Sequence, residues 1–157
     1  MPDGANPIPS KWIFTVKTDS MGNVVCYKAR LVAGGHRQIE GIDFTETFSP
    51  TVSWNSVRLF LALTVTNNLI PLQLDIDMAY LYRDIEPGVT IFMRPPQGVQ
   101  LPERCVYRLK KSLYGLKQAC RIWNSLIDEK LRAVGFVALD EDASIYIRSR
   151  GKEVTLL

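Results

Sequence analysis

The sequence predicts an α+β fold, with a mixed or antiparallel sheet and flanking helices. Three observations support this: two alternating segments flank a turn near the start, helical periodicity appears in two separate places, and short apolar runs bounded by Pro and Gly lie between them. A chain of 157 residues with 46% hydrophobic residues has the size and composition of one folded domain. Residues 1–10, rich in Pro, Gly and Asn, are expected to form a loose leader before a domain at 11–157.

The first expected element is a β-hairpin. Residues 11–17 alternate apolar and polar side chains, and residues 24–33 resume a strand after a stretch of turn-forming residues. Lys28 and Arg30 stand two positions apart in the second strand. Because side chains alternate between the faces of a strand, these two cations are predicted to share one face.

The middle of the chain predicts a helix followed by a buried strand. Ser53 is a typical helix N-cap, and apolar residues recur at helical spacing to about Asn67. Residues 70–76 form an apolar run that contains Asp75, and we expect them to form a central strand. Residues 77–84 are expected to form a short turn or helical segment.

The last third predicts a second long helix between short strands. The helix is expected from about Leu116 to Val134, with Gly135 ending it. The strand at the end of the chain should lie beside the strand that carries Asp75, or beside its neighbour. The short strands are expected at 89–93, 106–109, 144–148 and 153–157.

Composition excludes several classes of protein. The three cysteines are far apart and form no CxxC pair, which argues against a disulfide framework or zinc site and favours a reducing compartment. A single histidine excludes a multi-histidine metal site. No signal peptide is visible, and the apolar runs are too short to span a membrane. A net charge of +3 is compatible with a nucleic-acid partner but does not by itself indicate one.

Three segments contain residues suited to phosphate chemistry. Asp75 follows an apolar run, where a carboxylate is costly unless it is paired or binds a cation such as Mg²⁺. Lys28 and Arg30 could hold a triphosphate, and residues 108–118 interleave basic residues with Tyr and Gly ahead of a helix. Taken one at a time, ordinary structural roles are favoured for all three: a strand-end acid that caps a turn, a solvated hairpin face and a basic loop.

Taken together, these segments resemble the reverse transcriptase of copia-type LTR retrotransposons. The resemblance implies a right-hand polymerase, with a fingers hairpin followed by the palm, that carries out RNA-directed DNA synthesis by two-metal phosphoryl transfer. It covers roughly residues 11–157 in the order of the family, through the strings KWIFTVKTDSMGNVVCYKARLVAGG, GIDFTETFSPTVSWNSVRLFLAL, LQLDIDMAYLYRDI, RLKKSLYGLKQACRIWN and DASIYI.

The resemblance also implies a metal site and a nucleotide site. Asp75 would be the first metal-binding carboxylate, with the carbonyl of Ile76 beside it and Mg²⁺ or Mn²⁺ as the ion. The backbone amides of Met78 and Ala79 would face the incoming triphosphate. Tyr80 would lie under the sugar and exclude a 2′-hydroxyl by its bulk.

Further residues would complete the nucleotide site. By resemblance, Lys28 and Arg30 would approach the triphosphate from the fingers and converge on one cleft with Asp75 and Tyr80. The implied partners are dNTP, an RNA template and the RNA–DNA duplex, and the implied location is intracellular, in cytoplasmic virus-like particles or the nucleus. The nucleotide and template pocket would include Tyr114, Gly115 and Lys117.

The chain departs from the family pattern at scattered positions. The family usually has Lys or a similar residue where Asp77 stands, Phe at Tyr80 and Pro at Cys120. It usually has Asn-Gly at positions 82–83 and Lys-Gly at positions 34–35.

The largest departure concerns the second acidic cluster. In the family, the strand that resembles 153–157 leads into a Tyr-Val-Asp-Asp hairpin, which is absent from this sequence. We therefore expect a polymerase fragment that binds metal weakly and extends no primer alone, because one carboxylate cannot hold two ions. Two alternatives stay open: a non-catalytic nucleic-acid-binding module and a functionless transposon relic.

Overall fold

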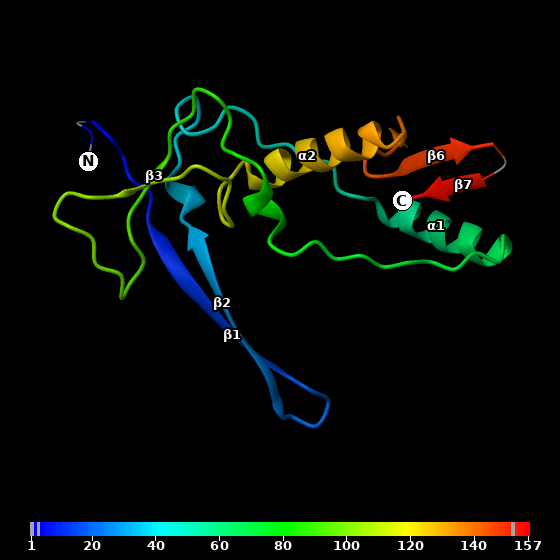
Figure 1. Cartoon of the computed structure of the whole chain (residues 1–157), viewed down its shortest axis with the longest axis horizontal. Coiled ribbons are helices and arrows are strands. Elements are labelled where there is room, and N and C mark those ends of the chain that lie inside the picture. Colours follow the sequence, from blue (N-terminus) through cyan, green and yellow to red (C-terminus); the bar gives the residue numbers. More distant parts are fainter. Residues whose placement is uncertain (1, 3, 152) are drawn as a thin grey trace. The chain divides into compact units, whose positions relative to one another are not determined.

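The computed structural model describes residue 2, residues 4–151 and residues 153–157. The chain divides into two compact units, and the domain bounds expected from the sequence stay a prediction. Unit 1 consists of Met1–Thr47 and Tyr80–Ile122, and unit 2 consists of Phe48–Ala79 and Trp123–Leu157. Each unit combines helical segments with small antiparallel sheets, which confirms a mixed α and β architecture at this level (Figure 1).

The expected hairpin is confirmed as the longest strand pair of unit 1. Strands β1 (Ser10–Thr18) and β2 (Val24–Ala33) pair in antiparallel register and form a long two-stranded ribbon (Figure 1). Asp19 shapes the turn between them, because its Oδ1 accepts hydrogen bonds from the backbone N–H groups of Met21 and Asn23, both at 2.9 Å. These local hydrogen bonds explain why the turn was recognisable from its residues.

The core of unit 1 forms where the start of the chain meets the strand pair β3 (Phe92–Met93) and β4 (Tyr107–Arg108). The backbone N–H of Ile8 donates to the carbonyl of Phe92 at 2.8 Å, and the Ile8 side chain is fully buried. Within the expected leader, Ile8 is therefore a core residue, although the leader boundary itself stays a prediction. The short strands expected at 89–93 and 106–109 are confirmed but shorter. The buried cluster comprises Ile8, Ala33, Ile91, Met93, Leu116 and Ala119.

Helix α1 (Trp54–Thr66) of unit 2 begins where the sequence predicts it. The Oγ of Ser53 accepts a hydrogen bond from the backbone N–H of Ser56 at 3.0 Å, which satisfies one of the unpaired donors at the helix start. Helix α2 (Ala119–Ala133) is shorter at its N-terminus than expected. Gly135, at φ 90°, ends it by donating its N–H to the carbonyl of Arg132 at 2.9 Å.

A three-stranded antiparallel sheet completes unit 2 in the order β5-β6-β7. Strands β6 (Tyr146–Arg150) and β7 (Glu153–Leu156) form the hairpin expected at the end of the chain. Strand β5 (Val137–Ala138), a two-residue strand, was not predicted.

The strand predicted at 70–76 is wrong. These residues are extended but have no strand partner within the described part of the chain, so β7 pairs with β6 and not with an Asp75 strand. Ile70, Leu72 and Leu74 are 87%, 85% and 83% exposed. Pro71 also lacks the N–H that a central strand requires. An apolar run predicts burial only where a second surface covers it.

Asp142, in the loop between β5 and β6, ties this sheet to the start of α1. Its Oδ2 accepts hydrogen bonds from the backbone N–H of Ser53 at 3.0 Å and from the hydroxyl of Ser56 at 2.6 Å. Its Oδ1 accepts from the backbone N–H of Ser144 at 3.0 Å. These hydrogen bonds, led by that from Ser56, lower the pKa of Asp142 to about 2.

We predict that Asp142→Ala lowers the melting temperature of the chain at neutral pH more than Ser53→Ala does, because Asp142 accepts three hydrogen bonds whereas the Ser53 side chain caps one backbone N–H. Because the pKa of Asp142 is lowered on folding, its contribution is present above the ordinary pKa of about 4 and is lost as pH falls toward about 2. Melting curves followed by circular dichroism, at neutral pH and at acid pH between about 4 and about 2, measure this effect. The difference in melting temperature between wild type and Asp142→Ala should become smaller in acid. The exposed neighbour Asp140, changed to Asn, is the control. Equal melting temperatures for wild type and Asp142→Ala at neutral pH would contradict the prediction.

Candidate functional site

The segment around Tyr114 is hydrogen-bonded directly to the base of the hairpin. The carbonyl of Tyr114 accepts a hydrogen bond from the backbone N–H of Ala33 at 2.8 Å. The carbonyl of Gly115 accepts one from the backbone N–H of Gly35 at 3.1 Å. Gly115 has φ 89°, and a Cβ at this position would lie 2.2 Å from the carbonyl oxygen of Ala33. The close approach of the two backbones therefore requires glycine at this position.

Three of the predicted nucleotide-site residues come together at this junction. The rings of Tyr80 and Tyr114 meet edge to face, with centroids 4.7 Å apart and planes at 71°. The guanidinium of Arg30 lies 5.8 Å from the centre of the Tyr114 ring, within reach of a cation–π interaction. Inside unit 1 the structure thus places Arg30 against Tyr114, and Tyr114 against Tyr80.

The hydroxyl of Tyr80 points to helix α2. It lies 3.2 Å from the Sγ of Cys120, and either atom could be the donor. This contact is the largest of the causes that raise the pKa of Tyr80 to about 12, followed by burial.

A buried amide network fixes the backbone next to Tyr114. Gln38 donates from Nε2 to the Oε1 of Gln118 at 3.0 Å and accepts at Oε1 from the backbone N–H of Lys117 at 2.8 Å. Gln118 in turn donates to the backbone carbonyl of Asp43 at 2.7 Å. The Nζ of Lys117 lies 4.8 Å from the centre of the Phe44 ring. No local sequence pattern indicates the Gln38–Gln118 pair, because the two residues are 80 positions apart.

The hairpin has one cationic face and one apolar face. Lys28 and Arg30 share a face, as predicted, and the register adds two lysines that the sequence analysis did not single out. These are Lys11 and Lys17 of strand β1. They pair with Val32 and Cys26, which lie on the same face of β2 as Lys28 and Arg30. The opposite face carries Trp12, Phe14, Val16, Tyr27, Ala29 and Leu31.

The remaining predicted site residues belong to unit 2. Asp75 and Met78 are exposed, and Met78 has φ 52°. Within the described residues no group of three or more Asp, Glu, His or Cys side chains could hold a metal ion. Because Lys28 and Arg30 belong to unit 1, their convergence with Asp75 stays a prediction.

The basic segment before α2 is less uniformly cationic in the structure than in the sequence. Arg108, Lys110 and Lys111 line a hollow of about 480 Å³ together with Asp84 and Glu86. Glu86 also forms an ion pair with Arg121. The two acids reduce the positive potential that the sequence alone suggests at this segment.

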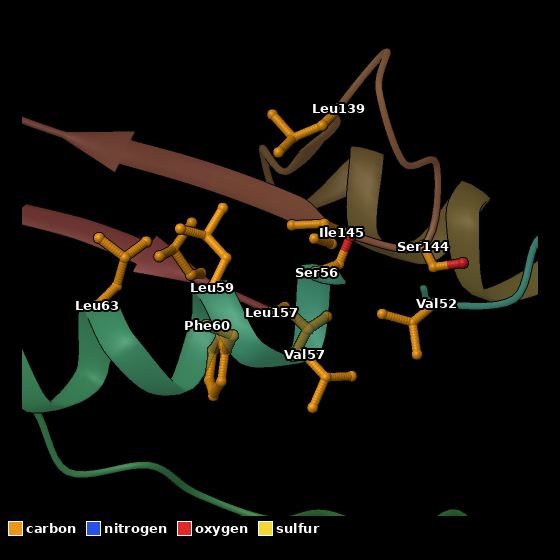
Figure 2. A pocket seen from close by; sticks show the side chains of 11 residues that line it. Val52, Ser56, Val57, Leu59, Phe60, Leu63, Leu139, Ser144, Ile145 and Leu157 are labelled. Carbon is orange, nitrogen blue, oxygen red and sulfur yellow. The ribbon is translucent and has the colours of Figure 1, made fainter. Parts of the chain in front are cut away.

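Unit 2 has a groove of about 320 Å³ with an almost entirely apolar lining (Figure 2). Figure 2 shows Leu59 and Leu63 projecting from α1 toward the sheet, and Ile145 lies on the opposite side. The serine hydroxyls of Ser56 and Ser144 are its polar groups. The lining supplies no acid, base or metal ligand, so this groove is not a candidate for chemistry.

Comparison with known proteins identifies the chain. Residues 1–157, the whole chain, match the family described as reverse transcriptase (RNA-dependent DNA polymerase). The chain belongs to this family. No solved structure matches this reverse transcriptase segment significantly. In the part of the chain that the structure describes, no helix has the length and apolar character needed to cross a membrane.

The similar curated proteins are retrotransposon polyproteins, which confirms the copia-type resemblance. The segment is 39% identical over 150 residues to the retrovirus-related Pol polyprotein from transposon TNT 1-94 of Nicotiana tabacum, covering 94% of this chain and 11% of the relative. It is 37% identical over 158 residues to that from transposon RE1 of Arabidopsis thaliana, covering 99% and 11%. The truncated transposon Ty1-A Gag-Pol polyprotein of Saccharomyces cerevisiae is 38% identical over 129 residues, covering 82% and 10%. The chain therefore spans about a tenth of the length of these relatives.

Proposed function

We propose that the chain supplies the fingers and part of the palm of a right-hand RNA-directed DNA polymerase and contributes its incoming-nucleotide site. The observation that carries this proposal is the cluster of Arg30, Tyr114 and Tyr80 at the base of the cationic hairpin. Aromatic rings next to a cation suit a nucleotide, whose sugar and base pack on rings while its phosphates bind the cation.

The proposed metal site lies on the segment that precedes Tyr80. Asp75, with the carbonyl of Ile76, would hold Mg²⁺ or Mn²⁺, because both groups offer the oxygen ligands that these ions prefer. When bound, the ion would neutralise phosphate charge during nucleotidyl transfer. The amides of Met78 and Ala79 would donate to the triphosphate. The positive φ of Met78 supports a tight turn at this position.

The cationic face of the hairpin would hold the triphosphate and the nucleic acid. Lys28 and Arg30 would bind the phosphates of a dNTP, and Lys11 and Lys17 extend the same face along the ribbon. Gly115 and Lys117 would line the pocket beside Tyr114, where the RNA template and RNA–DNA duplex would pass. An intracellular location, in virus-like particles or the nucleus, is proposed with this function.

A chimeric polymerase tests the proposal. In the tobacco polyprotein the segment that matches this chain is replaced by residues 1–157, and primer extension on an RNA template is measured against the unmodified polyprotein. Template-dependent DNA synthesis by the chimera is expected, since the chain would then have a complete palm. If the chimera folds and binds template but synthesises no DNA, the proposal is wrong.

The second candidate, a nucleic-acid-binding module, is favoured by the row of four cations on the hairpin. It predicts duplex affinity that falls steeply with salt, as expected for phosphate contacts, together with an inactive chimera. A functionless relic would bind no duplex and would show no cooperative melt. Gel-shift titrations at several salt concentrations, followed by thermal melting, separate these outcomes from the polymerase proposal.

A further inference from the structure

The contact between Tyr80 and Cys120 has no counterpart in the usual family pattern. That pattern places Phe and Pro at these positions, and neither side chain has a polar hydrogen-bonding group. In this chain the phenol hydroxyl and the thiol lie 3.2 Å apart, which is a hydrogen-bonding distance for sulfur. Both residues belong to unit 1, so the pair lies within one compact unit.

A tyrosine under the sugar of a nucleotide creates a specific difficulty. Its ring provides the bulk that excludes a 2′-hydroxyl, but its own hydroxyl can also form a hydrogen bond with that group. A hydrogen bond of this kind would favour a ribonucleotide, and so would work against the exclusion. The phenol therefore has to be held elsewhere for the ring to discriminate by shape.

We propose that Cys120 is a positioning residue that engages the hydroxyl of Tyr80 and keeps it away from the sugar, so that Tyr80 discriminates as a phenylalanine would. This inference rests on the proposed nucleotide site. Tyr80 is then held at two points: its ring meets the edge of Tyr114, with centroids 4.7 Å apart, and its hydroxyl meets the thiol at the start of α2.

The ionisation of Tyr80 agrees with this geometry. Its pKa is raised to about 12, and the contact with Cys120 is the first cause. A tyrosine whose hydroxyl faced solvent would ionise near its ordinary value of about 10. Burial raises the pKa of Tyr80 further, as do the neighbouring charges of Cys120 and Tyr114.

The first arm of the test measures the contact itself in the 157-residue chain. With tyrosine labelled at ¹³Cζ, the Tyr80 signal is assigned from Tyr80→Phe and followed by NMR between about pH 9 and pH 11, where an ordinary tyrosine ionises. We expect Tyr80 to stay protonated over this pH range in the wild type and to ionise in Cys120→Ala. In Cys120→Ser, which keeps a hydrogen-bonding group, the extent of ionisation should be intermediate. Cys105→Ala is the control thiol variant and should match the wild type. If the titration is the same in wild type and Cys120→Ala, the positioning contact is wrong.

The second arm measures discrimination. Binding of dATP and ATP is compared by ligand-observed NMR with Mg²⁺ and a template–primer duplex. We expect Cys120→Ala to lower the preference for dATP by roughly twofold to tenfold, the value of one hydrogen bond gained by the ribose hydroxyl. Cys120→Ser should restore most of the preference.

A double variant makes the second arm decisive. In the Tyr80→Phe background, Cys120→Ala should leave the preference unchanged, because no phenol remains to be held. A loss of equal size in both backgrounds would show a general structural effect and overturn the proposal. If the wild type binds neither nucleotide, the proposed nucleotide site is wrong, and so is the proposed role of Cys120 in sugar discrimination. The titration result then stands separately as a test of the Tyr80–Cys120 contact.

Discussion

Replacing Asp75 with Asn in the chimeric polymerase should reduce primer extension by at least about a hundredfold. The amide keeps the size of the side chain but removes the negative charge that would hold the ion in the proposed site, and metal coordination of a reacting phosphate is worth several kcal/mol. Each 1.4 kcal/mol corresponds to about tenfold in rate. Asp75 is exposed and lies outside the buried core, so the melting temperature should not change.

Asp77→Asn is the matched control, since Asp77 is an exposed carboxylate two positions away in the same segment. It should retain primer extension within about threefold of the unaltered chimera, because by the resemblance a lysine or a similar residue usually stands there, so the proposed site would not require this negative charge. Steady-state extension with Mg²⁺ measures both variants. Equal activity of Asp75→Asn and the unaltered chimera would show that the first metal ligand has been assigned to the wrong residue.

Replacing Gly115 with Ala should destabilise the chain by about 3 kcal/mol or more. Two effects add at this position. The positive φ of 89° is unfavourable for a residue with a side chain, and the new Cβ would lie 2.2 Å from the carbonyl oxygen of Ala33 and 2.6 Å from the Cγ1 of Val32. Both neighbours belong to β2, so the steric clash can be removed only if the hairpin and the Tyr114 segment move apart.

Gly88→Ala isolates the backbone effect. Gly88 has nearly the same φ, 86°, but no atom lies within 4 Å of the Cβ position. It should cost only about 1 kcal/mol. Urea unfolding followed by circular dichroism measures both variants, and the amide signals of Ala33 and Gly35 report whether the junction opens. If the two variants are equally stable, the junction is not a close contact.

Elements determined by nearby residues were predictable from the sequence. The hairpin turn depends on Asp19 and its neighbours, and the start of α1 depends on the Ser53 cap, so local chemistry was sufficient. The strand at 70–76 was not predictable in this way, since an apolar run becomes a strand only when a partner pairs with it. Ile8 was missed for the converse reason: a Pro-rich context suggested a loose segment, but β3 supplies its hydrogen-bond partner.

The same distinction holds for the candidate site. Lys28 and Arg30 could be placed on one face by counting two positions, whereas Lys11 and Lys17 joined them only once the register of β1 against β2 was known. The family resemblance assigned Arg30 and Tyr114 to a nucleotide site, but their contact became visible only in the structure, because no local pattern brings together residues so far apart in the chain.

The tight junction at Gly115 bears on how such elements lose function over generations. Gly115 is required by the close approach of two backbones, and the buried side chain of Gln118 bonds to Gln38 and Asp43. Selection for a protein that merely folds would therefore retain both residues. Asp75, exposed and outside the core, has no such protection. In a copy under no selection for DNA synthesis, we expect the carboxylate to be lost first while the glycine and glutamine persist, so retention of Gly115 and Gln118 alone would indicate a protein that folds and not one that synthesises DNA.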